Sequence, residues 1–391
     1  MNKYQNKLNL VVLPFLVSAL SFSLFLGTAV FSIFITLTIL LWLVSGEWTI
    51  KFAAMKNNPV VISALLLFGV IALGLFWSHV PWEEKFPMFM KYHRLLYIPM
   101  IVSILQTDLQ RRHAINAFLV VSIGILFISY GKFLGMLPFH DEGMGYVVTR
   151  NRISHSIFMS FAAFLMLHRM VAHHGIYRYV WGSLGALAVA NVMFLVNGRT
   201  GQLIVMTLIA IFVWQQLGAK SIGYFIVTAI LAVIALKTVP AIQHSRLLAV
   251  GQEINDANSS SGLRMGFYKN SIELVKKHPV LGIGTGAFKS EYAKQVEENK
   301  EIQATANPHN QYLLIAIETG LVGLFAFLFF LLSGWRSAAY LGAQEGNVLQ
   351  GLVLLFALGS AFNSLLFDAG EGRFYCTILA VIVSQLHFKK T

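Results

Sequence analysis

Charged residues are scarce in this sequence of 391 amino acids. Only 12% of the residues are Asp, Glu, Lys or Arg, whereas 57% are apolar and the mean hydropathy is +0.68. A soluble domain carries about a quarter charged residues, so a chain this poor in charge cannot cover a water-facing surface of its size. Lipid must be its main solvent, which predicts an all-α polytopic membrane protein.

Cysteine and polar linkers are also nearly absent. Cys376 is the single cysteine and lies in an apolar segment, so disulfides have no structural part. No long polar linker divides the apolar segments, and we therefore expect one transmembrane domain over residues 1–391. The first apolar run follows Lys3 and Lys7 and continues almost directly into a second run, which favours a retained anchor over a cleaved signal.

Aspartate is rare as well, and this bears on metal chemistry. The chain has four aspartates, and none lies within two residues of another: Asp108, Asp141, Asp256 and Asp368. A carboxylate pair that would hold a divalent ion on a diphosphate is therefore missing at short range. We expect no metal and no cofactor, so a diphosphate would be neutralised by arginines, which can bind it with two parallel hydrogen bonds.

The apolar stretches are long enough for about twelve membrane spans of roughly 20 residues each. No residue between Leu8 and Ser45 is charged, and Gly27 with Thr28 breaks this run into two helices. The further predicted spans are roughly 59–78, 90–107, 114–135, 154–170, 178–196, 200–217, 221–238, 311–333, 347–367 and 373–388.

The loop charges predict the orientation of these spans. With both termini in the cytoplasm, the inner loops are rich in Lys and Arg and poor in acids, as the positive-inside rule requires. The longest hydrophilic segment, 239–310 between the ninth and tenth spans, then faces the non-cytoplasmic side. Since the basic residues stand singly between apolar spans, the net charge of +12 points to membrane lipids and anionic lipid-linked substrates rather than to nucleic acid.

The outer side nevertheless keeps cations of its own. Each of them alone fits a solvated or snorkelling side chain. As a group they suggest that an anion is held at the outer membrane surface. These residues are Lys85, Lys91, Arg94, Lys132, Arg150, Arg152, Arg199 and Arg373.

The outer loop has the pattern of a small helical unit. Ser261 is placed to cap a helix over about 262–277, which ends at His278 because a proline follows. A second helix is expected over 287–303. The glycines at 282, 284 and 286 lack the preceding strand and the Lys-Ser/Thr of a phosphate-binding loop, so we expect a tight, flexible turn there. Ordered loops of this length usually have a catalytic or binding role.

Three basic residues of this region are candidates for chemistry. Arg199 stands where one span ends and the next begins, and Arg264 stands near the start of the first loop helix, where anions are favoured. His309, at the mouth of the span that follows the loop, can act as a general base near pH 7. The alternatives remain an interfacial anchor, a surface arginine and a structural histidine.

Four motifs, taken in order, resemble the bacterial O-antigen ligase and polymerase superfamily over most of the chain. They are the basic segment 91–99, the Arg-x-Gly segment 198–201, the loop segments 261–264 and 278–286, and the histidine segment 308–313. Relatives often carry an aromatic residue four positions after the loop arginine, and Tyr268 stands there.

The resemblance implies a metal-independent, inverting glycosyltransferase of the bacterial inner membrane with its active site facing the periplasm. An O-antigen ligase moves a glycan from undecaprenyl diphosphate to a sugar hydroxyl of lipid A–core. Arg199 and Arg264, supported by Arg94 or Lys91, would hold the donor diphosphate, and His309 would take the proton from the acceptor.

Two other classes of function are weighed against an O-antigen ligase. An O-antigen polymerase or a protein O-oligosaccharyltransferase shares fold and donor, and no short motif separates the acceptors. A transporter of lipid-linked glycans would place ionisable residues in the middle of its spans, whereas here the cations gather at the outer edge.

Overall fold

The computed structural model describes residues 3–138, 144–149, 151–223, 259–298 and 303–386. The prediction of an all-α membrane protein is confirmed, since these residues form helices and contain no strand beyond one isolated bridge between Gly145 and Val196. The expected helix at 221–238 and the loop residues 239–258 lie largely outside this range.

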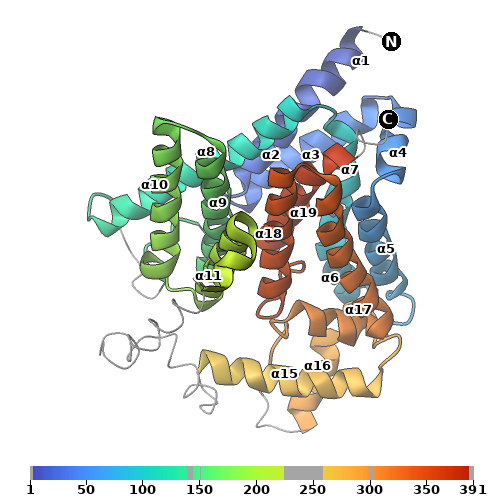
Figure 1. Ribbon diagram of the computed structural model, residues 1–391. Coiled ribbons are helices and arrows are strands. Elements are labelled where there is room, and N and C mark those ends of the chain that lie inside the picture. The colour runs from blue at the N-terminus through green and yellow to red at the C-terminus, as the bar shows by residue number, and fades with distance from the viewer. Residues whose placement is uncertain (1–2, 139–143, 150, 224–258, 299–302, 387–391) are drawn as a thin grey trace, which may run out of the picture.

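The helices of the described residues have the following bounds, with labels as in Figure 1: α1 Lys3–Lys7, α2 Leu13–Ser23, α3 Thr28–Val44, α4 Trp48–Lys56, α5 Pro59–Leu73, α6 Trp82–Met90, α7 Tyr97–Ile104, α8 Asp108–Phe133, α9 Arg152–Ala172, α10 Ile176–Ala190, α11 Arg199–Leu217, α15 Ser260–Lys277, α16 Phe288–Glu298, α17 Gln311–Ser337, α18 Ala343–Ser360 and α19 Ala369–Val383. Short π-helical turns precede α2 and follow α10, and a 3₁₀ segment, Lys91–Leu96, precedes α7.

Six helices of the described residues are long and apolar enough to cross a membrane, or up to seven if the bent pair α3–α4 forms one span. They correspond to six of the twelve predicted spans: Tyr4–Ser23, Asp108–Phe133, Arg152–Ala172, Ile176–Leu195, Arg199–Gly223 and Gln311–Tyr340. The chain is thus a multi-pass membrane protein, and the total of twelve stays a prediction.

Several other apolar segments form helices that are short or broken. The α5 helix has 15 residues, or about 22 Å at 1.5 Å per residue, which is less than the roughly 30 Å hydrocarbon core. The predicted span 90–107 begins as a 3₁₀ segment and contains only the eight-residue α7. The α19 helix has 15 residues and is buried along most of its length, so it is a core helix of the bundle.

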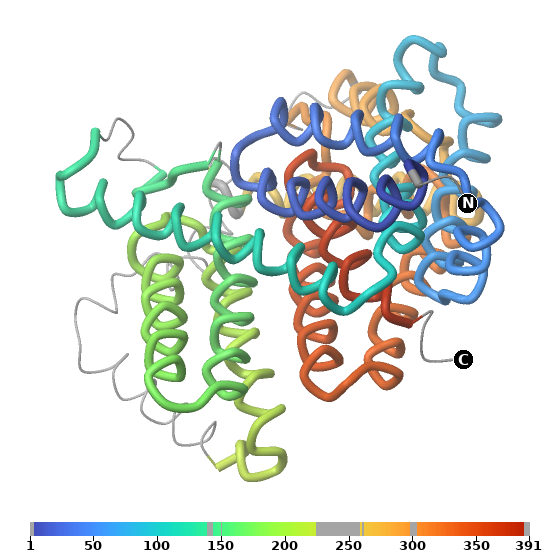
Figure 2. Tube along the Cα trace, turned by 90° about the horizontal axis from the view of Figure 1, so that it is seen from above, coloured from blue at the N-terminus to red at the C-terminus, as the bar shows by residue number. Residues whose placement is uncertain are grey.

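Two groups of helices make up the bundle, as the view along its axis shows (Figure 2). In one group, α9 packs against α10 and α11, and in the other α17 packs against α5 and α19 packs against α7. The α18 helix packs against both α11 and α17 and so joins the two groups.

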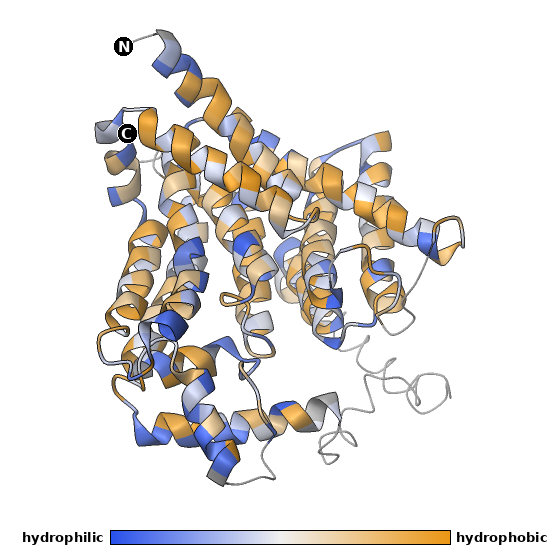
Figure 3. Cartoon of the chain, turned by 180° about the vertical axis from the view of Figure 1, so that it is seen from behind, coloured by the Kyte–Doolittle hydropathy of each residue, from blue (hydrophilic) through white to orange (hydrophobic). Residues whose placement is uncertain are grey.

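The loop helices α15 and α16 lie across one end of the bundle, opposite the end at which α1 begins (Figure 1). Blue, hydrophilic residues gather on α15 and α16, whereas the bundle helices are mainly orange (Figure 3). The predicted loop helix 262–277 is therefore confirmed as α15, and α16 confirms the second predicted helix, 287–303, over the part up to Glu298, beyond which residues 299–302 lie outside the described range.

The glycine-rich segment, residues 282–286, attaches the cap formed by α15 and α16 to α17 and α5. Gly282 and Gly284 have φ values of +68° and +96°, which favour glycine. The amides of Ile283 and Gly284 donate to the carbonyls of Ile317 and Glu318 at 2.9 Å each, just before the kink of α17 at Gly320. A Cβ at Gly284 would lie 2.3 Å from the Ser78 Cα. The turn expected to be flexible is thus fixed by backbone pairing.

Candidate active site

Arg199 is the first residue of α11, and the glycines around it explain its position. Gly201 packs so closely against α9 that a Cβ there would lie 2.0 Å from the Cβ of Ser156. The Arg-x-Gly motif therefore lets α11 begin directly against α9. Arg199 is half-buried there and lies near enough to Arg264 of α15 for their charges to interact.

Arg264 lies in the second turn of α15. This helix starts two residues earlier than predicted, because the hydroxyl of Ser259, rather than that of Ser261, caps it by accepting from the Gly262 amide at 2.9 Å. The guanidinium donates to the Asn363 Oδ1 at 3.5 Å, and the Asn363 amide donates to the Thr200 hydroxyl at 3.5 Å. Asn363 thereby links Arg264 to the residue that follows Arg199.

Like charges surround the Arg264 guanidinium. Burial lowers the pKa of Arg264, and the neighbouring charges of Arg152 and Arg199 lower it further, while Tyr268 acts in the opposite direction. Three arginines from α9, α11 and α15 are thus close enough to repel one another. An anion among them would relieve this repulsion, which is the arrangement that a diphosphate site requires.

His309 lies beside this arginine cluster in an unusual backbone conformation. Its φ is +54°, in the left-handed region that few residues other than glycine adopt. The His309 amide donates to Asn307 Oδ1 at 2.9 Å, and the His309 carbonyl accepts from the Tyr268 hydroxyl at 3.2 Å. The imidazole lies tilted by 30° to the Phe267 ring, with centroids 6.1 Å apart. These contacts fix the direction in which the side chain leaves the backbone.

Burial lowers the pKa of His309 below its ordinary value of 6.5, and the positive charge of Arg264 lowers it further. The imidazole is therefore neutral at pH 7 and able to accept a proton. This electrostatic coupling also shows that the structure brings His309 and Arg264 together. Arg199 and His309, which are far apart in the sequence, thus both lie close enough to Arg264 to affect its charge or be affected by it.

The amide side chains around His309 bind the segment between α18 and α19 rather than the imidazole. They belong to Asn307, Asn310 and Gln311. Asn307 Oδ1 accepts from the Ser364 hydroxyl at 2.6 Å, and the Asn310 amide donates to the Ala361 carbonyl at 3.0 Å. Gln311 Oε1 accepts from the amides of residues 366 and 367. They position the backbone around the site rather than the ring.

A cavity of about 390 Å³ opens beside His309 and Asn363. The start of α19 contributes Asp368, Glu371 and Arg373 to its wall, and the turn between α2 and α3 contributes apolar side chains. The cavity therefore joins polar groups of the site to a wall suited to a lipid-linked molecule.

Arg94 and Lys91 lie on the Asp368 side of this cavity, away from the arginine cluster. Arg94 is 5% exposed, and one of its terminal nitrogens donates to the carbonyls of Leu366, Phe367 and Asp368 at 2.9–3.1 Å. The Lys91 ammonium lies 3.7 Å from the centre of the Phe367 ring. These two predicted diphosphate ligands are thus engaged with the segment 366–368.

Other outer cations also bind backbone carbonyls. Lys85 donates to the carbonyls of Leu75 and Ser78 at 3.0 Å each, and Lys132 donates to the Val147 carbonyl at 2.8 Å. Arg373 donates to the Thr28 carbonyl at 3.2 Å. Apart from Arg150, which lies outside the described residues, the predicted group of outer cations therefore divides into cations that contact loop segments and the arginines near His309.

Sequence reasoning missed Asn363 and the acidic pair Asp368 and Glu371. Burial first and the negative charge of Glu371 second together raise the pKa of Asp368 to about 7. The wide spacing of the aspartates along the sequence gave no sign of this Asp–Glu pair. Within the described residues, no group of three His, Cys, Asp or Glu side chains is placed to hold a metal ion.

Comparison with known proteins finds a family match and two partial relatives. Residues 184–328 match the sequence model of a family described as O-antigen ligase, and this stretch contains Arg199, Arg264 and His309. The chain is 27% identical to an O-antigen polymerase of Salmonella muenchen over 171 residues, 41% of each sequence. It is 32% identical to an uncharacterised protein of Haemophilus influenzae over 84 residues, 21% of each sequence.

The matches thus span about a fifth and about two fifths of the length of these relatives. The motifs, the family match and the similarity to the polymerase agree, and they support the resemblance to the O-antigen ligase and polymerase superfamily.

Proposed function

We propose that this protein is an O-antigen ligase. It transfers a glycan from undecaprenyl diphosphate to a sugar hydroxyl of lipid A–core, with its active site on the periplasmic face of the bacterial inner membrane. The observation that carries the proposal is the pairing of a neutral His309, which lines a cavity together with Asn363, with the cationic Arg264, which donates to Asn363. A base and an anion site next to each other are what transfer from a diphosphate to a hydroxyl needs.

In the proposed reaction, Arg199 and Arg264 hold the donor diphosphate and stabilise the charge that grows on it as it leaves. The acceptor oxygen attacks the anomeric carbon on the face opposite the diphosphate, and the bond from that carbon to the diphosphate oxygen breaks. The proton of the acceptor hydroxyl passes to His309. The new glycosidic bond has the inverted anomeric configuration, and undecaprenyl diphosphate is released.

The proposed reaction needs no divalent metal, because arginines neutralise the diphosphate. Purified protein is expected to transfer glycan at an unchanged rate in excess chelator. The measurement compares initial rates with chelator alone and with chelator followed by excess magnesium. A rate that vanishes with chelator and returns with magnesium would contradict metal independence.

A polymerase is the second candidate, because one relative carries that name. Polymerases and ligases of this superfamily share the donor and differ in the acceptor. The lipopolysaccharide profile of a deletion strain tests the choice. Loss of all long chains, with accumulation of lipid-linked polymer, is the outcome expected of a ligase. Addition of single repeats alone would identify a polymerase, and an unchanged profile with loss of a glycosylated protein would identify a protein glycosyltransferase.

A further inference from the structure

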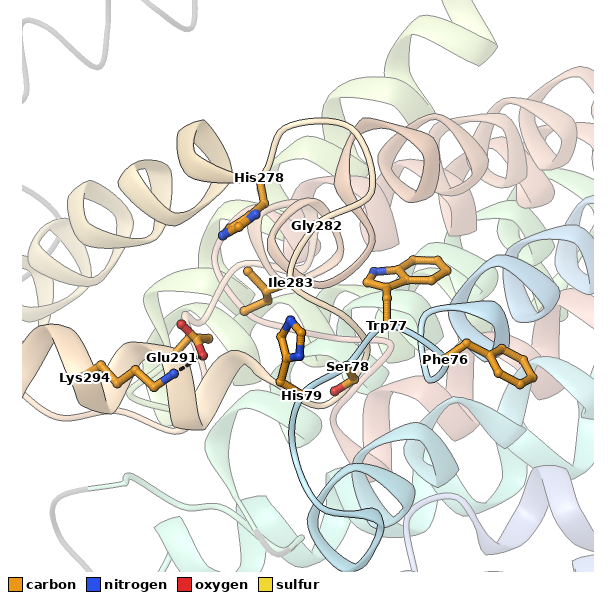
Figure 4. Close-up of a pocket in the computed structure, with 9 residues that line it drawn as sticks. All are labelled: Phe76, Trp77, Ser78, His79, His278, Gly282, Ile283, Glu291 and Lys294. Atoms are coloured by element: carbon orange, nitrogen blue, oxygen red, sulfur yellow. Dashed lines mark hydrogen bonds and ion pairs between the residues drawn. The ribbon is translucent and has the colours of Figure 1, made fainter.

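A second pocket, of about 460 Å³, lies at the far end of α15 (Figure 4). It is lined by residues 76–79, which follow α5, by His278 at the end of α15, by Gly282 and Ile283, and by Glu291 and Lys294 of α16. His278 is 14 residues beyond Arg264, which corresponds to about 21 Å along the helix axis. The pocket is therefore separate from the transfer site but lies along the same helix.

The walls of this pocket are held in place without a ligand. The Trp77 indole donates to the Leu281 carbonyl at 3.0 Å, and the Thr285 amide donates to the Gly74 carbonyl at 3.0 Å. The Lys85 ammonium donates to the Ser78 carbonyl at 3.0 Å. A pocket that is already formed loses little conformational entropy when a ligand enters, which favours binding.

The polar groups of the pocket point to a ligand rich in hydroxyls. The Ser78 hydroxyl is buried and has no hydrogen-bond partner among the residues that the structure describes. A buried hydroxyl without a partner costs free energy, and a ligand hydroxyl would relieve that cost. The exposed imidazoles of His79 and His278 approach the pocket from opposite sides, where each offers a donor and an acceptor (Figure 4).

The charges of the pocket cancel, which argues against an anionic ligand. Glu291 and Lys294 form an ion pair of 2.6 Å on one side of the pocket, and Trp77 provides an aromatic ring on the other (Figure 4). The acidic and imidazole groups here do not form a group of three placed to hold a metal ion. An uncharged ligand with many hydroxyls and an apolar face suits such a surface, and a carbohydrate has both.

We propose that this pocket is a distal subsite that binds sugars of the glycan chain remote from the reacting end. This inference rests on the proposed function, because it assigns the ligand as part of the same substrate. The distance from Arg264 means that a chain of several sugars can reach both sites, whereas a short one cannot. The subsite would therefore make binding depend on glycan length.

The test uses the full-length protein in detergent and the host's own lipid-linked donor with its diphosphate intact, so that the reacting end is held at the arginines. The donor is fractionated into single repeats and long chains, and calorimetry measures the affinity of each fraction. In the double variant His79→Ala/His278→Ala, long chains are expected to bind roughly tenfold more weakly, the loss expected for two hydrogen bonds. Single repeats should bind as they do to the wild type. The matched control is His113→Ala/His174→Ala, which removes two exposed imidazoles at the opposite end of the bundle.

Ser78→Ala gives a second readout that does not depend on the histidines. It removes a hydroxyl without a partner, so the Tm of the free protein should stay the same or rise, while long-chain affinity should fall. Equal long-chain affinity in the wild type and the double variant, or equal losses for single repeats and long chains, would overturn the subsite. Failure of the proposed function appears separately, as a wild-type protein that binds long glycan but transfers none.

Discussion

Arg94 and Arg264 both bind the segment between α18 and α19, yet they do so in opposite ways. Arg94 is almost fully buried and donates to three backbone carbonyls between residues 366 and 368. Among the described residues Arg264 donates one hydrogen bond, of 3.5 Å, to the side chain of Asn363, and it faces the charges of Arg152 and Arg199. Arg94 also faces a like charge, that of Arg373, but three backbone carbonyls hold one of its terminal nitrogens, and Arg264 has no such carbonyl contact among these residues.

This difference separates a structural cation from one that is placed to receive an anion. Carbonyl oxygens compensate the Arg94 charge in the free protein, so a diphosphate would have to displace them to bind there. A diphosphate next to Arg264 would instead remove a like-charge repulsion. Proximity to a cavity is therefore a poorer guide to function than the partners that each charge already has.

Removal of the His309 imidazole should have the largest effect on transfer. General-base catalysis contributes about a hundredfold to ten-thousandfold in rate, so His309→Ala should lose turnover within that range. Donor affinity should stay close to that of the wild type, because the arginines are unchanged. The measurement is single-turnover transfer together with donor binding, and His113→Ala is the control.

Turnover in His309→Ala within about threefold of the wild type, well short of the general-base range, would show that His309 is not the base. Loss of donor binding with turnover would instead make His309 a ligand of the diphosphate.

Lysine at Arg264 or Arg199 should have the next largest effect. It keeps the charge but loses the planar pair of donors that matches a diphosphate. A loss of about a hundredfold in turnover is expected for each variant, near the lower end of what one lost transition-state donor costs. Arg336→Lys, at an exposed arginine of the opposite end, is the control. Wild-type rates in both Lys variants would rule out bidentate binding.

The pH profile should show a moderate but diagnostic effect. The pKa of His309 is lowered by burial first and by Arg264 second, so the neutral base persists below pH 6.5 and is lost only as the pH falls through the lowered pKa. The acidic limb of kcat/KM, which reports the free enzyme, should therefore lie below 6.5. A limb controlled by Asp368 would lie near its pKa of about 7.

Asp368→Asn distinguishes these two groups. The limb should stay where it is in this variant if His309 controls it. A limb near pH 7 that disappears in Asp368→Asn would assign the titration to Asp368 and contradict the role of His309.

The sequence singled out three candidate residues but not the scaffold that joins them. Arg199, Arg264 and His309 stand out because their motifs have a fixed order and spacing. Asn363 lies in an ordinary loop 54 residues after His309, and no local pattern shows that it links Arg264 to Thr200.

The form of the bundle was also only partly predictable. Hydropathy found the long spans and the break at Gly27, where φ is +111°. It missed the kink of α17 at Gly320, because that kink depends on pairing with residues 279–284 of the cap. Local hydropathy contains no record of such a distant contact.

The smallest effect on turnover is expected at Arg94, and this prediction tests the comparison most directly. Arg94→Gln removes the donor that holds three carbonyls, and hydrogen bonds to a charged group contribute about 1.5–3 kcal/mol. The protein should therefore unfold at a lower temperature, while turnover per folded molecule stays within a few-fold of the wild type. Thermal unfolding and active-site titration of the same preparation measure both quantities.

If Arg94→Gln leaves the Tm unchanged but impairs transfer as strongly as Arg264→Lys, Arg94 is a donor ligand. Its carbonyl contacts would then give way to the diphosphate when the donor binds, and the two arginines would belong to one site after all.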